Sequence, residues 1–224
     1  METAASTTKE SLLFAAGELF AEHGLEGTSI RAIADKCQAN IAAVNYHFGS
    51  KENLYLKVIR HVLERTRCCR AEELLKRKHE WMQDPHKSAE AVYRVIEEHI
   101  QQYFTGIHPR WYGRIFMRIL LQPTPAIWEI MEELLMPNLN CLREVLHCCR
   151  PGMSESEAEL WADTLMGQLA HYIFAEDFML IIPKHRKLHD VSYQKDILRH
   201  VARVMIRGLQ LSMPDFLREE SAHA

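Results

Sequence analysis

The residues with the most potential for chemistry in this sequence form one short run, NYHFGSK, from Asn45 to Lys51. An asparagine amide donates and accepts hydrogen bonds together, and a tyrosine hydroxyl or a histidine ring adds further donors. Lys51 follows a Gly-Ser turn, and a lysine at the start of a helix adds positive charge where backbone N–H groups already favour an anion. A buried core does not need this order of residues, whereas a surface that reads another molecule could use it.

Short helices must hold this run in place. The apolar spacing predicts helices over residues 8–23, 30–36 and 41–46, with Gly24 ending the first and Gly49 the third. Thr28 or Ser29, then Asn40 and Ser50, are the expected N-caps. The second and third helices are joined by only a few residues, which is the helix-turn-helix arrangement. Both are too short to be stable alone, so they need the neighbouring helices as packing partners.

The rest of the chain also favours helices. It has 224 residues, 47% of them hydrophobic, and only nine Gly and eight Pro, so we expect an all-α protein of about nine helices. No run of about 18 apolar residues predicts a membrane span, and the N-terminus lacks the pattern of a secretory signal, so a cytosolic protein without membrane contact is expected. The six later helices are predicted to begin near residues 51, 88, 109, 125 (with a kink at Pro137), 154 and 192.

The sequence around this run resembles a known family. TSIRAIADKCQANIAAVNYHFGSKENL, residues 28–54, is similar to the DNA-binding domain of TetR/AcrR transcriptional regulators, and the match covers about residues 9–57. PTPAIWEIMEELLMPNLNCL and MGQLAHYIFAEDFMLII are similar to the C-terminal domain of the CecR/YbiH-type subgroup. The resemblance implies a helix-turn-helix domain over residues 1–56 and a helical effector-binding and dimerisation domain over residues 57–224. It further implies a homodimer, by family habit a repressor, that binds a palindromic double-stranded DNA operator and is released by a small-molecule effector.

The expected DNA contacts follow from the shape and chemistry of the third helix. Ala42 and Ala43 are small enough for close approach to a major groove, and Asn45 matches the donor and acceptor that adenine offers there. The resemblance implies that Tyr46 and His47 meet phosphates, whereas Val44 and Phe48 are expected in the core. Thr28 and Ser50 would cap helices with or without DNA. The candidate contacts are Thr28, Ser29, Arg31, Ile41, Ala42, Ala43, Asn45, Tyr46, His47 and Lys51.

The charge balance limits this DNA interface. The formal net charge is -3, and residues 1–60 contain six Lys and Arg against seven Asp and Glu. Most of these acids lie on the first helix and its exit, away from the expected DNA face. We therefore expect few phosphate contacts in each subunit and a modest dependence of DNA affinity on salt.

The later helices are expected to form a dimer surface and an effector site. The last two long helices would supply the dimer surface, through apolar stripes that could instead pack within their own subunit: Leu160, Trp161, Leu165, Leu169 and Tyr172, and Val201, Val204, Met205 and Gly208. The middle helices would enclose an apolar effector site with a few polar anchors. Its candidate residues are His99, Trp111, Phe116, Met117, Arg118, Trp128, Met131, Gln168, His171, Phe174 and Met179.

Other classes of protein fit less well. The chain has no Gly-rich phosphate loop, nucleophile elbow or helical His-Glu-x-x-His pattern, so we expect neither an enzyme nor a cofactor. His185 and His189 have helical ligand spacing without a clear third ligand, and no metal site is expected. The six cysteines are expected to be small buried side chains rather than redox sensors. A helical adaptor that binds only proteins stays open as the alternative function.

Overall fold

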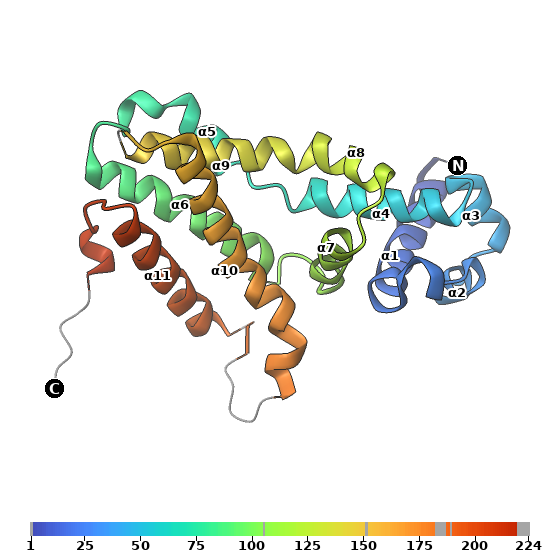
Figure 1. The fold of residues 1–224 in the computed structure, drawn as a ribbon. Helices are drawn as coiled ribbons and strands as arrows, with labels where there is room; N and C mark the ends of the chain where they lie inside the picture. The colour runs from blue at the N-terminus through green and yellow to red at the C-terminus, as the bar shows by residue number, and fades with distance from the viewer. Residues whose placement is uncertain (1, 105, 151, 182–186, 189, 219–224) are drawn as a thin grey trace. The chain divides into compact units, whose positions relative to one another are not determined.

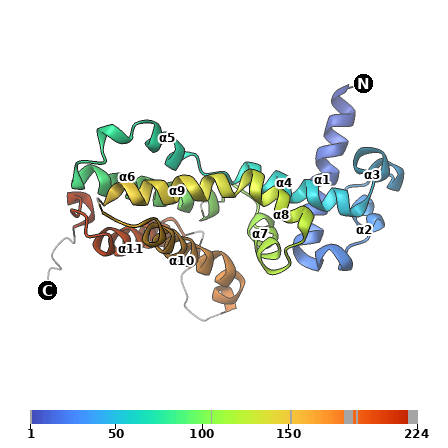
Figure 2. The ribbon, with the colours of Figure 1, turned by 45° about the horizontal axis from the view of Figure 1, so that its top comes forward.

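Helices make up the regular structure of the chain. The computed structural model describes the backbone of residues 2–104, 106–150, 152–181, 187–188 and 190–218, and the side chains of these residues except 2–7 and 174–181. Within these ranges it contains eleven α-helices, two short 3-10 helices and no strand (Figures 1 and 2). The all-α prediction is confirmed. There are two more helices than expected, because the segment 125–149 forms two helices and residues 70–76 form one that the pattern did not predict.

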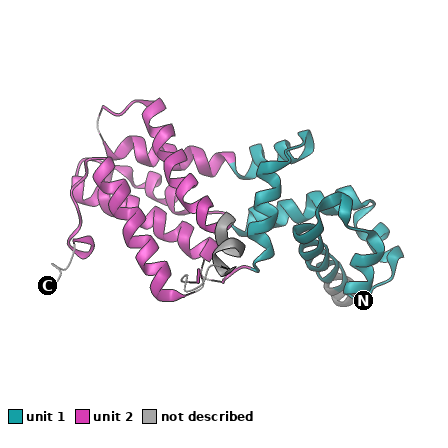
Figure 3. Cartoon of the chain, turned by 60° about the horizontal axis from the view of Figure 1, so that its bottom comes forward, with its two compact units in different colours: residues 1–66, 109–135 teal, residues 67–108, 136–224 magenta. Residues whose placement is uncertain are grey.

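The chain divides into two compact units (Figure 3). Unit 1 comprises residues 1–66 and 109–135. It contains α1 (Glu2–Gly27), α2 (Ile30–Lys36), α3 (Ile41–Phe48), α4 (Lys51–Arg65), α7 (Trp111–Leu121) and α8 (Pro125–Leu134). The expected domain boundary between residues 56 and 57 falls inside α4. In this structure α7 and α8 pack with the N-terminal helices, while the functional division at that boundary stays a prediction.

The core of unit 1 fixes α2 and α3 against longer helices. Phe20 of α1, Ile33 of α2, Val44 of α3 and Leu54 of α4 are each fully buried in one cluster, which also takes in Ile115 of α7. Burying an aliphatic or aromatic side chain of this size stabilises the fold by roughly 1.5–3 kcal/mol. The two short helices therefore depend on α1, α4 and α7 for their stability.

Side-chain caps define where the short helices begin. The Oγ of Ser29 accepts from the backbone N–H of Ala32 at 3.1 Å, and Oδ1 of Asn40 accepts from that of Ala42 at 2.9 Å. The Oγ of Ser50 accepts from the N–H of Asn53 at 3.1 Å. The α1 helix breaks at Gly24, whose φ is 75°, and Gly49 ends α3 with a φ of 78°. These values lie in the left-handed region, where a glycine is unstrained.

Unit 2 comprises residues 67–108 and 136–224. Its helices are α5 (Arg70–Lys76), η1 (Lys78–Glu80), α6 (Pro85–Phe104), α9 (Met136–Cys149), α10 (Glu155–Ile181), α11 (Val191–Gly208) and η2 (Asp215–Leu217). Fully buried Ile96, Leu146, Leu165 and Met205 bring α6, α9, α10 and α11 into one core. None of the described helices in either unit combines the length and apolar character needed to cross a lipid bilayer.

Two predicted helix starts in unit 2 were wrong. Asp84, rather than Ser88, caps α6, because its Oδ1 accepts from the N–H of His86 at 2.9 Å while Ser88 is buried and donates to the carbonyl of Trp81. Asp190, rather than Ser192, caps α11. In each case an aspartate earlier in the chain is the first side chain that can accept from the free N–H groups.

Proline breaks the long helix predicted over residues 125–149. The segment forms α8 and α9, with Pro137 as the second residue of α9. Proline fits the first turn of a helix because it has no N–H to donate. Instead of the kink expected at Pro137, the chain therefore ends one helix at Leu134 and begins another at Met136.

Candidate nucleic-acid interface

The outer face of α3 presents the residues expected to read DNA. Ile41 and Tyr46 are 45% and 85% exposed, and Ala42 and Asn45 are exposed between them. Val44 and Phe48 point into the core of unit 1, as predicted. The helix therefore has one apolar face that anchors it and one face of small and polar side chains that is open to solvent.

A shallow cleft joins this face to the starts of two neighbouring helices. Its volume is about 650 Å³, and it is lined by Ser29 at the start of α2, Asn45 of α3, and Ser50 and Lys51 at the start of α4. The first N–H groups of a helix have no partner within that helix, and they favour an anion. Backbone donors, a lysine and an asparagine amide thus converge on one surface that suits phosphate and base edges.

Aromatic rings extend this surface past the end of α3. The rings of Tyr46 and His47 meet edge to face with centroids 5.0 Å apart, and the ring of His47 also contacts Phe48 at 6.2 Å. Because Phe48 is buried, it holds His47 in place, while Tyr46 is free to reach outward. Both predicted phosphate-facing side chains therefore lie beside Asn45 at the exposed end of the helix.

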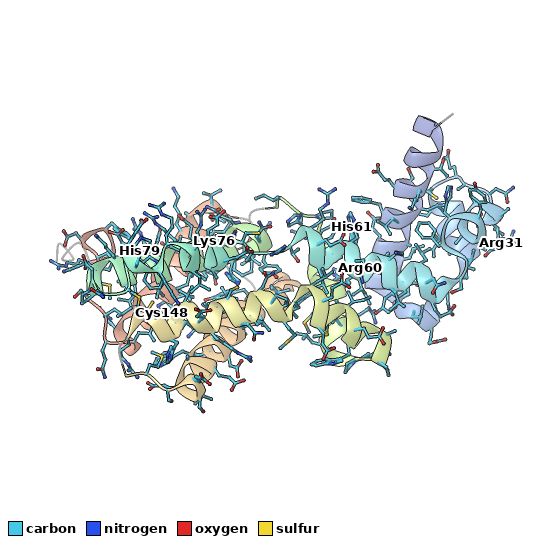
Figure 4. The ribbon with its side chains drawn as sticks, turned by 90° about the horizontal axis from the view of Figure 1, so that it is seen from above. Arg31, Arg60, His61, Lys76, His79 and Cys148 are labelled. Carbon is cyan, nitrogen blue, oxygen red and sulfur yellow. The ribbon has the colours of Figure 1, made fainter. Side chains whose placement is uncertain are left out.

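Two predicted DNA contacts, Arg31 and Thr28, are already paired with other groups of the fold. Arg31 lies on the exposed side of α2 (Figure 4), where its Nε is 3.9 Å from the carboxylate of Asp35. Thr28 is only 3% exposed, and its hydroxyl donates to the carbonyls of Gly24 at 2.7 Å and Leu19 at 3.2 Å. Its hydroxyl thus already donates within the fold, while Thr28 also lines the cleft, so a DNA contact by this residue stays a prediction.

Two carboxylates that the sequence pattern did not single out also border the cleft. Glu26 precedes α2, and Glu52 lies in the first turn of α4. The backbone N–H of Glu52 and the hydroxyl of Ser50 hold the pKa of Glu52 below its usual value, so it stays ionised at neutral pH. These charges oppose an approaching phosphate. They could have been found from the sequence, because both sit within three residues of a predicted cap.

The predicted effector residues are distributed over both units. Trp111, Phe116 and Met131 lie in the core of unit 1, whereas His99 lies in the core of unit 2. In unit 2, Gln168 is half-buried and His171 is exposed on α10. Trp128 is 47% exposed, with its Nε1 donating to Glu132, and Met117 is half-buried on α7. The side chains of Phe174 and Met179 lie outside the described residues.

Three of these predicted effector residues, Trp111, Gln168 and Arg118, differ in whether their polar atoms have hydrogen-bond partners. Nε1 of Trp111 and Oε1 of Gln168 are buried without a hydrogen-bond partner among the described residues. Buried polar atoms are rarely left unpaired, so these two are exceptions in the described part of the chain. The guanidinium of Arg118, a predicted ligand anchor, donates to the carbonyls of Ala21 and Glu22 on α1.

The predicted dimer stripes on α10 and α11 are largely internal to unit 2. Leu165, Leu169, Val201 and Met205 are each at most 1% exposed, so these four side chains cannot meet a partner subunit. Trp161 lies on Gly208, where an added Cβ would be 2.1 Å from its ring, and Tyr172 is half-buried beside Tyr193. Leu160 and Val204, which are 64% and 37% exposed, are the members of the stripes that remain open.

The six cysteines are free thiols, two of them buried and four half-buried, whereas all six were expected to be buried. Burial raises the pKa of the Cys68 and Cys149 thiols, which keeps them protonated and unreactive. No group of three His, Cys, Asp or Glu among the described residues is placed to hold a metal ion. His185 and His189 lie outside the described residues.

Comparison with protein families assigns both parts of the chain. Residues 12–58 match the family described as bacterial regulatory proteins, tetR family. Residues 88–209, more than half of the chain, match the family described as the C-terminal domain of the HTH-type transcriptional dual regulator CecR. The first match contains the cleft described above, and the second contains most of unit 2 together with α7 and α8.

Individual relatives agree with this assignment. The transcriptional dual regulator CecR of Shigella flexneri is 50% identical over 48 residues, which are 21% of each chain. The transcriptional repressor AcnR of Corynebacterium glutamicum is 36% identical over 55 residues, 25% of this chain and 29% of that protein. The chain thus spans less than a third of the length of these curated relatives. The relatives are transcriptional regulators rather than enzymes, as the sequence predicted.

Solved structures extend the likeness to the whole fold. The crystal structure of AibR in complex with isovaleryl coenzyme A and operator DNA has a TM-score of 0.60 and 16% sequence identity. The similarity covers 88% of this chain and 96% of that chain. At this identity the likeness concerns the fold.

Proposed function

Because the chain belongs to the TetR family of bacterial regulatory proteins, with a CecR-type C-terminal domain, we propose that it is a ligand-responsive transcriptional regulator. It acts as a repressor that binds a palindromic operator as a homodimer and leaves it when a small-molecule effector binds. It works in the cytoplasm, together with the DNA. The main support is the exposed face of α3 beside a cleft formed by two capped helix starts.

In this proposal α3 enters the major groove with its exposed face toward the bases. Ile41, Ala42, Ala43 and Asn45 are the side chains that reach base edges. The groove is about 12 Å wide, so the small alanines let the backbone come close and their methyl groups can touch thymine methyls. Asn45 then pairs with adenine, accepting from its N6 amino group and donating to N7.

Phosphates bind around the cleft and fix the position of α3. Lys51 and the first N–H groups of α4 hold one phosphate, and Ser29 with Arg31 holds a neighbouring one. Tyr46 and His47 donate to the DNA backbone at the end of α3. Glu26 and Glu52 oppose these contacts, which supports the expectation of a modest salt dependence.

Dimerisation supplies the second reading helix. One short helix reads too few base pairs for specificity, whereas two helices one DNA turn apart, about 34–36 Å, read a palindrome. The exposed Leu160 of α10 and Val204 of α11 support a dimer surface on these helices. An added Cβ at Gly167, also on α10, would meet no atom within 4 Å, so a partner helix could approach there.

The effector acts through the helices that follow residue 56. In unit 2, Oε1 of Gln168 is buried without a hydrogen-bond partner among the described residues, which supports a polar contact with a ligand. Such a ligand lowers operator affinity only if it binds the DNA-free conformation more tightly than the DNA-bound one. The alternative, an adaptor that binds only proteins, is not favoured, because the tetR-family match includes the helix-turn-helix itself.

A gel-shift experiment with the promoter of its own gene tests the proposal. Wild-type protein should shift this DNA. Tyr46→Ala and Lys51→Ala should weaken the shift without loss of helical circular dichroism, because both residues lie on the surface. Wild-type protein that shifts neither this promoter nor other DNA from the same genome would contradict the proposal. A thermal-shift screen against small molecules would then identify the effector.

A further inference from the structure

Near its C-terminal end, α1 is interrupted at Gly24, and α7 makes hydrogen bonds to the interrupted segment. We call residues 21–29, which connect this break to the start of α2, the α1–α2 joint. Gly24 has φ and ψ of 75° and 178°, so α1 leaves helical geometry there. A helix leaves its last carbonyls without N–H partners. Arg118 of α7 supplies donors for two of these carbonyls. Its Nε donates to the carbonyl of Ala21 at 3.1 Å, and its Nη2 donates to the carbonyl of Glu22 at 3.0 Å. A positive charge at a helix C-terminus is also favoured by the helix dipole.

Thr28 closes the same joint on the side of α2. Its buried hydroxyl donates to the carbonyls of Gly24 and Leu19, on either side of the two that Arg118 uses. The next residue, Ser29, is the N-cap of α2. The two side chains therefore fix the turn that leads directly to the start of α2 and to its predicted phosphate contacts.

The guanidinium is packed closely at this joint. A Cβ added at Gly24 would lie 2.9 Å from Nη1 of Arg118, so a larger residue there would shift the guanidinium and would also be strained at a φ of 75°. Arg118 also lies near Tyr55 of α4, where burial raises the pKa of the tyrosine and the arginine charge acts against that rise. Arg118 thus sits where α1, α4 and α7 meet within unit 1.

We propose that Arg118 is a positioning residue for DNA binding, by which α7 fixes the α1–α2 joint and so aims Ser29 and Arg31 at the phosphate backbone. Movement of α7 withdraws the guanidinium, loosens the joint and lowers operator affinity. The inference rests on the proposed function of the chain as a DNA-binding regulator. An arginine is needed because its planar fork reaches two carbonyls at once, whereas a lysine presents a single ammonium group.

Operator affinity and amide exchange test this role together. Arg118→Met should weaken operator binding by about tenfold or more, because two charge-assisted hydrogen bonds are lost from the joint. Arg118→Lys should retain part of the affinity. The exposed Arg114, one turn earlier on α7, provides the matched control, and Arg114→Met should bind as the wild type does. In free protein, the Ala32 amide should exchange faster in Arg118→Met, while amides in the middle of α4 keep their protection.

A double-mutant cycle separates positioning from a general loss of stability. Ser29→Ala should weaken binding in the wild-type background, have a smaller effect in Arg118→Lys and have little further effect in Arg118→Met, because both changes act on the same contact. Additive effects, or operator affinity unchanged in Arg118→Met, would overturn the inference. If the wild type bound no DNA, the proposed function would fail. The exchange experiment would still decide the role of Arg118 at the joint, and an unchanged rate at Ala32 would refute it.

Discussion

Base reading and phosphate binding belong to different residues of this interface. Asn45 lies on the exposed face of α3, whereas Lys51 lies at the start of α4 on the other side of the Gly49 turn. Base contacts determine sequence preference, and phosphate contacts determine affinity and its salt dependence. The two residues should therefore fail in different ways when they are replaced.

Replacing Asn45 should alter sequence preference more than affinity for non-specific DNA. A lost bidentate contact removes about 1–3 kcal/mol of discrimination at one base pair in each half-site. Asn45→Ala protein should therefore tolerate other bases at one position of each half-site, as selection from random DNA would show. An unchanged preference at every position would mean that Asn45 does not contact a base.

Replacing Lys51 should weaken binding to all sequences. Loss of one phosphate contact in each subunit should reduce the slope of log K against log salt by about 0.9 for each contact. Fluorescence anisotropy with operator and non-specific DNA at several salt concentrations measures both slopes. Lys36→Ala, which replaces a lysine of α2 that is paired with Glu18, serves as the control. Equal slopes for Lys51→Ala and wild type would contradict the assignment.

Local chemistry predicted the buried face of α3 better than the turn between α1 and α2. Val44 and Phe48 were correctly expected in the core, because both are large and apolar on the inner face of α3. Between Thr28 and Ser29, the sequence could not decide which side chain caps α2. The roles of Thr28 and Arg118 depend on carbonyls of α1, up to 97 residues away from Arg118, and no local pattern records such a contact.

The sequence predicted some helix caps correctly and others wrongly. Asn40, Ser50 and Ser154 accept from the N–H groups expected of them. Ser88 and Ser192 do not act as caps, since an aspartate four and two residues earlier, respectively, caps each helix. Thr28 and Ser88 are buried and their hydroxyls donate to carbonyls elsewhere, whereas Ser192 is exposed and simply follows the cap. Burial is a property of the folded chain, so the sequence could not decide the first two cases.

Helix α6 contains a buried histidine that makes stability depend on pH. Nδ1 of His99 lies 2.8 Å from the carbonyl of Val95, which can only accept, so Nδ1 carries a proton and donates it to this carbonyl. Burial lowers the pKa of His99 below its ordinary value of 6.5. Below about pH 6.5 the unfolded chain binds a proton that the folded chain does not, so the free energy of unfolding should fall as pH decreases.

The expected loss is at most about 1.4 kcal/mol for each pH unit from this one group. Urea unfolding followed by circular dichroism between pH 7 and pH 5 would measure it. His99→Leu should flatten this dependence, whereas His147→Gln, at an exposed histidine of α9, should not. A His99→Leu protein with the wild-type pH dependence would show that His99 is not its source.

At the scale of the whole molecule, the sequence pattern did not reveal how the later helices are shared between the two units. Trp111 and Gln168, both predicted effector residues, belong to different units. Apolar periodicity identifies the buried face of a helix but not the helix that covers it. For the same reason, Leu165 and Met205 were expected at a dimer surface and instead pack inside unit 2.

The exposed residues of α10 and α11 allow a test of the dimer. Leu160→Glu and Val204→Glu should each convert the dimer to a monomer in sedimentation experiments, because a charge would be buried at the interface. Affinity for a full palindrome should then fall by about an order of magnitude or more, since the two heads no longer bind together. Val191→Glu, at a 63% exposed residue on another face of α11, should leave the dimer intact. A wild-type monomer would refute the proposed dimer.

The most direct test of the central claim is selection of bound sequences from random double-stranded DNA with the wild-type protein. The proposal predicts enrichment of a palindrome whose half-sites lie about one helical turn apart, with an adenine at the position that Asn45→Ala relaxes. Enrichment of no sequence above non-specific background would contradict it, and the chain would then not be an operator-binding regulator.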